Sequence, residues 1–294
     1  MISTTRYFDG QSIYIGAISP TAIGKTGFDI PEINFTSPVL DPRIIYNGPP
    51  HMYFAQDGTL KMSAANEFPL EYRNGVAVGR HEPEKESTNL MRGNQYESMG
   101  PASQSTADWT YGGQVATAAD SALGFKEALT NPFGLLTGIF NEQTNAFIAA
   151  VQDSGAPTDW EIIRRPATNP AVSLLRWYVA RVSSTDYLYG RANAVPVGQL
   201  VASVIRKADA TNVHSVLAQL EMGTISTSPI VTPLNNSATR AASTLEIKTN
   251  NAPRIIIHYS DGTVSPISNP GPIYTFPVST MNWGARYITK VEFS

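Results

Sequence analysis

Apolar and polar residues alternate along the longer segments between residues 100 and 230. Val216, Ala218 and Leu220 share one face of an extended segment whose other face is largely polar, which is typical of a half-buried strand. Trp177–Val182 and Leu200–Ile205 also have strand patterns, and the second is largely apolar on both faces, as in a sandwich interior. The count and spacing of such segments predict two stacked β-sheets.

Segment Gly134–Val151 fits two kinds of element. Its apolar pairs recur about four residues apart, and Thr130–Pro132 would make a fair helix start. The alternative is a hairpin in which Leu135–Phe140 turns back into Ala146–Val151. The pattern of residues by itself leaves both elements open.

The remainder of the chain consists of short apolar runs separated by turn residues. Asn-Gly or Asp-Gly pairs, which tolerate the positive φ of tight hairpins, occur at 47–48, 57–58, 74–75 and 261–262. Prolines at 20, 31 and 38 exclude a long helix near the N-terminus. We therefore expect an extended arm over 1–40, a small β-rich collar over 41–98, a sandwich over 99–232 and C-terminal hairpins over 233–294 that pack on the sandwich or the collar.

Composition narrows the classes of function. Charged residues make up only 15% of the 294, the net charge is −3, and no basic run is present, which argues against a nucleic-acid footprint. The chain has no cysteine, so disulfides and thiolate chemistry are excluded. No stretch approaches the ~18 apolar residues of a membrane span, and no signal-peptide pattern is present, so we expect no membrane insertion and a polypeptide made in the cytoplasm.

Two blocks far apart in the chain carry the most specific pattern. Their defining positions are Gly79, Glu82, Pro83, Thr88, Asn89 and Leu90 in the first block, and Ala218, Gln219, Leu220, Glu221, Gly223, Thr227, Ser228, Ile230, Thr232 and Pro233 in the second, followed by residues 239–242. Together the blocks resemble the paired signatures of phage tail-fibre and minor structural proteins. The family usually has a basic residue before Thr-Asn-Leu, where this chain has Ser87. The blocks flank a jelly-roll domain of the concanavalin-like or carbohydrate-binding-module-like kind in that family.

The resemblance implies a fold, a setting and partners. The fold would be all-β, a jelly-roll β-sandwich with the arm and collar, and the hairpin is favoured at 134–151. The protein would be a non-enzymatic virion component assembled in the host bacterium, most simply a homotrimeric tail fibre, fibre adaptor or receptor-binding protein. Its partners would be other tail or capsid proteins, contacted through the arm, and a host cell-surface glycan. Two alternatives stay open: a capsid decoration or head-fibre-base protein, and a polysaccharide-acting enzyme.

Catalytic and cofactor motifs are not apparent. Ser19–Thr26 approaches a phosphate-binding loop, but a serine replaces its first glycine and no helix can follow before Pro31. The four histidines lack metal-ligand spacing, and no nucleophile elbow occurs. Any two of the 24 acidic residues could lie at a glycosidase spacing, so none is singled out. We expect no catalytic residue, metal or cofactor.

Two groups of residues remain as site candidates. Trp160, Tyr187 and Tyr189 lie in polar surroundings and could stack on sugar rings, although core or interface packing explains each of them as well. The other group forms the structural signature, which we interpret as a joint between subdomains: Glu82, Thr88, Asn89, Leu90, Gln219, Glu221 and Arg240. Around the first of these residues, Glu82, Glu84 and Glu86 would face one side of an extended chain, and we expect a solvated edge there rather than a contact with cations.

Overall fold

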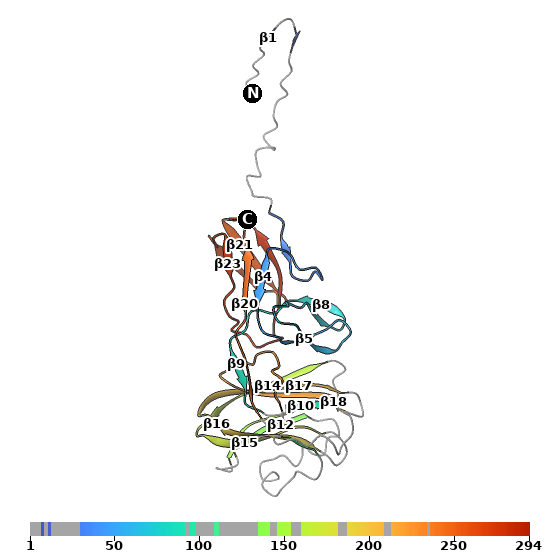
Figure 1. Ribbon diagram of the computed structural model, residues 1–294, viewed down its shortest axis with the longest axis vertical. Helices are drawn as coiled ribbons and strands as arrows, with labels where there is room; N and C mark the ends of the chain where they lie inside the picture. Colours follow the sequence, from blue (N-terminus) through green and yellow to red (C-terminus); the bar gives the residue numbers. More distant parts are fainter. Residues whose placement is uncertain are drawn as a thin grey trace.

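A computed structural model of the chain is built from antiparallel β-sheets (Figure 1). It describes residues 7–8, 11–12, 30–91, 94–97, 109–111, 135–141, 146–153, 160–181, 187–208, 213–233 and 236–294. Within these ranges there are strands and turns but no helix, so the predicted all-β class is confirmed. The segment 19–26 that approaches a phosphate-binding loop lies outside the described residues.

The described strands between Gln95 and Met222 form a unit of two stacked sheets, here called the inserted sandwich (Figure 1). The first sheet has the order β10 (Gln95–Glu97), β18 (Val213–Met222), β17 (Gly198–Ala208), β14 (Glu161–Asn169). The second has the order β11 (Trp109–Tyr111), β16 (Tyr187–Val195), β15 (Ser173–Arg181), β12 (Leu135–Asn141), β13 (Ala146–Asp153).

Hairpins dominate the connectivity of the inserted sandwich. β12 pairs with β13 antiparallel, so the described residues of segment 134–151 form the two strands of the predicted hairpin and not a helix. β15 pairs with β16 and β17 with β18 in the same way. The sheets do not close into a barrel, and this strand order does not establish the two Greek keys of a jelly roll. The jelly-roll assignment is therefore not confirmed.

The second unit, here called the split unit, is made from residues 30–91 and 236–294. One of its sheets has the order β22 (Val264–Ser268), β21 (Arg254–Tyr259), β24 (Ile288–Phe293), β3 (Ile33–Asn34). The other has the order β23 (Ile273–Thr275), β20 (Thr244–Lys248), β4 (Ile44–Asn47). Two hairpins complete it: β5 (Met52–Phe54) with β6 (Leu60–Met62), and β7 (Glu71–Arg73) with β8 (Val76–Gly79).

The core of the split unit takes residues from both ends of the chain. Ile33 and Phe35 are fully buried together with Leu245, Ile255 and Val291. The end of the predicted arm, from residue 33, therefore belongs to this core, whereas most of residues 1–29 lie outside the described part of the chain. The C-terminal strands pack on the segment predicted as a collar, so neither segment buries its apolar face without the other.

Turn chemistry accounts for some of the hairpins. Asn74 and Gly75 have φ of 50° and 75°, as a type I′ turn requires, and they join β7 to β8. The pair at 261–262 likewise joins β21 to β22. Asn47-Gly48 differs from its predicted role: β4 pairs with β20 and not with β5, and Gly48 packs closely against the ring of Tyr46.

A small apolar cluster lies where the two units meet. Met52 and Phe54 of the split unit pack with Ile205 and Leu217 of the inserted sandwich, and Trp283 stacks on Phe54 with ring centroids 4.8 Å apart. Burial of such side chains contributes roughly 1.5–3 kcal/mol each. The units therefore share an apolar contact beside the polar one described next.

Candidate functional site

The chain crosses between the two units on a pair of short antiparallel strands. β9 (Ser87–Asn89) leads into the inserted sandwich, and β19 (Ala238–Arg240) leads out of it. Thr88 lies opposite Thr239, and their hydroxyl oxygens are 2.7 Å apart. The two sequence blocks, which lie far apart in the chain, therefore meet side by side at this crossing, here called the junction (Figure 1).

One buried carboxylate of the junction, Glu84, is held by Ser228 and Arg240. The Ser228 main-chain N–H donates to Oε1 at 2.6 Å, and its hydroxyl donates to Oε2 at 2.7 Å. Arg240 Nη1 lies 3.0 Å from Oε2, and the guanidinium also donates to the Ser228 carbonyl at 3.2 Å. All three residues are buried, so this ion pair acts where solvent screens it little.

A second carboxylate, Glu221, is fully buried and is held by neutral donors. Thr227 donates from its main-chain N–H at 2.9 Å and from its hydroxyl at 2.6 Å. Gln219 Nε2 donates at 2.6 Å, and the Ser87 hydroxyl donates to the other oxygen. Among the described residues no cation pairs with this carboxylate. Four donors thus replace the water that the charge lost on burial.

Side-chain amides take the place of main-chain pairing along residues 230–232, which form no strand. Asn89 Nδ2 donates to the Ile230 carbonyl at 3.1 Å, and its Oδ1 accepts from the Leu220 N–H at 3.0 Å. Gln219 Oε1 accepts from the Ile230 N–H at 2.7 Å. Leu90 is anchored by its own N–H, which donates to the Leu220 carbonyl at 2.9 Å. Buried main-chain groups must be paired, and here the amides pair them.

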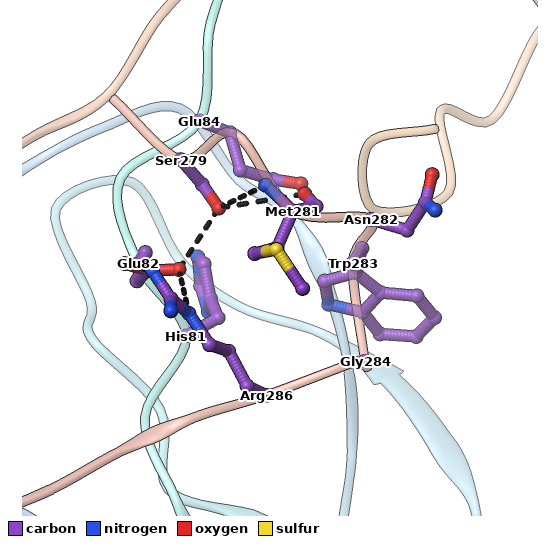
Figure 2. A pocket seen from close by; sticks show the side chains of 9 residues that line it. All are labelled: His81, Glu82, Glu84, Ser279, Met281, Asn282, Trp283, Gly284 and Arg286. Carbon is purple, nitrogen blue, oxygen red and sulfur yellow. Dashed lines mark hydrogen bonds and ion pairs between the residues drawn. The ribbon is translucent and has the colours of Figure 1, made fainter. Parts of the chain in front are cut away.

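Glu82 belongs to a neighbouring cluster that joins the first block to the C-terminal segment. Arg286 donates to both of its oxygens, from Nε at 2.9 Å and from Nη2 at 2.7 Å, and the Ser279 hydroxyl adds a bond of 3.0 Å (Figure 2). The carboxylate of Glu82 raises the pKa of Arg286 above its usual range. The Arg286 guanidinium also lies 4.0 Å from the ring centroid of Tyr259.

The expected solvated edge of acids is wrong for two of its three members. Glu82 is 6% exposed and Glu84 is 7% exposed, whereas Glu86 is exposed. The acids do alternate along an extended chain, but Arg286 and Arg240 cover the side they face. The cations come from residues about 150 to 200 positions later, which no local pattern could indicate.

Beside Glu82 lies a cavity of about 10 Å³, which is room for a single water molecule (Figure 2). His81 and Trp283 line it, and both ring nitrogens of His81 and the indole N–H are buried without a hydrogen-bond partner among the described residues. No cluster of three or more His, Asp or Glu able to hold a metal ion occurs in the described part of the chain. The cavity can hold water but is too small for a sugar or a peptide.

Sequence reasoning missed a buried group in which two of the four histidines meet. The rings of His51 and His81 lie 4.4 Å apart, centroid to centroid, in an edge-to-face arrangement. His81 Nδ1 is 3.5 Å from a carboxylate oxygen of Glu71, which is fully buried. His51 and His81 are 30 positions apart in the sequence with no ligand spacing between them, so the fold brings them together.

Of the three residues predicted to contact a glycan, only Trp160 has a side chain that the structure describes. Trp160 is half-buried, its Nε1 donates to the Gly58 carbonyl at 3.0 Å, and its ring packs near Phe54, so it bridges the two units. Tyr187 and Tyr189 lie on β16, opposite Arg181 and Tyr178, and their side chains fall outside the described atoms. A glycan role for these three residues stays a prediction.

Comparisons with known proteins identify no relative: no family model, no curated protein and no solved structure matches this chain. In the part of the chain that the structure describes, no helix has the length and apolarity needed to cross a membrane.

Proposed function

We propose that this protein is a non-enzymatic structural component of a phage virion, most simply a tail fibre, fibre adaptor or receptor-binding protein. The split unit would attach to the particle, and the inserted sandwich would be presented outward. The virion setting comes from the resemblance of the two sequence blocks. The observation that carries the structural role is that the buried side chains of both blocks are bonded to one another at the junction.

The bonding at the junction favours a mechanical role over catalysis. A general acid or nucleophile must reach a substrate, whereas Glu84 and Glu221 are buried and each carboxylate oxygen accepts at least one hydrogen bond. Hydrogen bonds to charged groups contribute about 1.5–3 kcal/mol each. Because bending the units apart would break several together, the junction suits a rigid connection between a base and a presented domain.

Immunogold electron microscopy of particles of the phage that encodes the chain tests the proposal. Antibody against the inserted sandwich should place gold on the tail tip or fibres. Gold over the head would favour the capsid decoration alternative, and bare particles from cells that express the protein would refute the virion role.

The oligomeric and binding parts of the proposal need separate measurements. Light scattering coupled to size exclusion should give the mass of a trimer of the 31.8 kDa chain, and a monomer at every concentration would contradict the fibre version. The two stacked sheets of the inserted sandwich support the proposal that it is related to jelly-roll domains and that it binds a glycan. Release of reducing ends from host polysaccharide would instead favour the enzyme alternative.

A further inference from the structure

Arg80 is a buried cation for which the described residues supply no counter-charge. Its side chain is 3% exposed, and no carboxylate in the described ranges forms an ion pair with it. One terminal nitrogen donates to the Phe68 carbonyl and the other to the Ser37 carbonyl at 2.9 Å, while Nε has no acceptor. Burial lowers the pKa of Arg80 to about 10, which reflects the cost of removing the charge from water.

Arg80 is also one of the residues that line an open groove of about 330 Å³ on the surface of the split unit. This volume lies within the range of ligand sites in proteins. Its walls combine apolar, aromatic and polar groups, among them Pro38, Leu40, Phe68, Pro69 and Tyr72. Tyr72 is half-buried and carries a phenol that can donate a hydrogen bond.

One acidic residue also lines the groove, so its effect on an anion must be weighed. Glu67 is exposed, and its Oε2 accepts the main-chain N–H of Ala64 at 2.7 Å. Its charge is therefore partly engaged and is screened by solvent, whereas that of Arg80 is buried and uncompensated. The net preference of the groove is for a negatively charged group.

We propose that this groove binds an extended, acidic segment of a partner protein, with a carboxylate beside Arg80 and apolar neighbours against Pro38 and Leu40. Charge complementarity identifies the occupant, because a carboxylate supplies the counter-charge that Arg80 lacks. The apolar walls and the open shape suit a peptide that carries aliphatic side chains on either side of its acid. The inference does not rest on the virion role.

The competing explanation is that Arg80 only ties two loops together through the Ser37 and Phe68 carbonyls. A purely structural arginine would not distinguish a carboxylate from a carboxamide of the same shape. Replacing Arg80 itself cannot separate these explanations, since the variant would also lose both loop contacts. Variants at the rim of the groove avoid this difficulty.

Isothermal titration calorimetry of the full chain tests this with two peptides. One is acetyl-Pro-Leu-Glu-Leu-Pro-amide, and the other is the same peptide with Gln in place of Glu. The Glu peptide should bind at least about tenfold tighter, and its advantage should shrink as salt is raised. Leu40→Glu places a second acid on the wall and should weaken the Glu peptide at least about tenfold. Val39→Glu is the matched control, because Val39 is 75% exposed and lies outside the groove lining.

The outcomes that overturn the proposal are distinct. Equal affinity for the two peptides would mean that Arg80 only holds the two loops together and does not recognise a carboxylate. Equal effects of Leu40→Glu and Val39→Glu would place binding elsewhere, and so would an unchanged affinity in both variants. Failure of the Glu peptide to bind at millimolar concentration would reject an acidic-peptide site. Thermal unfolding of each variant would verify that a loss of binding does not come from a loss of fold.

Discussion

Acid should destabilise the protein through His51, a buried histidine that the fold keeps neutral. Its side chain is 2% exposed, and its Nδ1 lies 3.2 Å from the Ser63 hydroxyl and 3.3 Å from the Pro49 carbonyl. The Tyr46 hydroxyl is 3.5 Å from the same atom, and the ring of His81 packs against the ring of His51. Burial first, and then repulsion from His81, lower the pKa of His51 from 6.5 to about 2.

The sign and size of the effect follow from proton binding. Below pH 6.5 the unfolded chain protonates this histidine, whereas the folded chain does not until about pH 2, so stability falls as pH decreases between these values. Each pH unit in that window costs about 1.4 kcal/mol, so the loss from pH 7 to pH 5 is about 2 kcal/mol. The positive charge of Arg240 acts in the same direction, and Glu71 faces His81 on the far side of the pair.

Urea denaturation of the wild type and of His51→Gln, followed by far-ultraviolet circular dichroism at pH 7, 6 and 5, measures this contribution. Gln is neutral at every pH, so the variant can be less stable at pH 7 yet should lose about 2 kcal/mol less than the wild type on acidification. The remaining ionisable side chains are common to both proteins. Identical pH dependence in the two proteins, or a wild type that gains stability in acid, would refute the reasoning.

Three further predictions concern the junction and its neighbours. Arg286→Met should lower the free energy of unfolding by about 3 kcal/mol, because it leaves the buried Glu82 carboxylate without its cation. Adding Glu82→Gln to the same chain should recover part of the loss. Strictly additive losses in a double-mutant cycle would contradict this pairing. Glu221→Gln should cost about 2–3 kcal/mol in urea denaturation, because one carboxylate oxygen that accepts hydrogen bonds becomes an NH₂ group facing donors. Unchanged stability would count against the hydrogen bonds assigned to Glu221. Gly79→Ala should cost at least about 3 kcal/mol in thermal unfolding, because a Cβ at φ +120° would overlap a main-chain carbonyl of β24. Gly262→Ala, at φ +82° with open space around it, should cost only about 1 kcal/mol. Similar losses in the two variants would contradict the steric argument.

Local pattern was enough to predict the class of fold and much of the strand content. Alternation around Val216 and Leu220 indicates a strand because successive side chains point to opposite faces, and β18 spans both residues. The hairpin around Gly262 is equally local, since Asp-Gly favours the turn that joins β21 to β22. Such inferences succeed because the deciding interactions lie within about ten residues of one another in the chain.

Contacts between residues that lie far apart in the chain could not be predicted in the same way. The residue pattern is enough to predict an all-β chain with two blocks suited to a joint. The pairing of β9 with β19, and the burial of Glu82 against Arg286 and of Glu84 against Arg240, depend on how distant parts of the folded chain meet. Alternation indicates which face of a strand a side chain occupies, but it does not indicate which residues cover that face. A carboxylate without its distant cation belongs in water, and with it the same carboxylate can be buried.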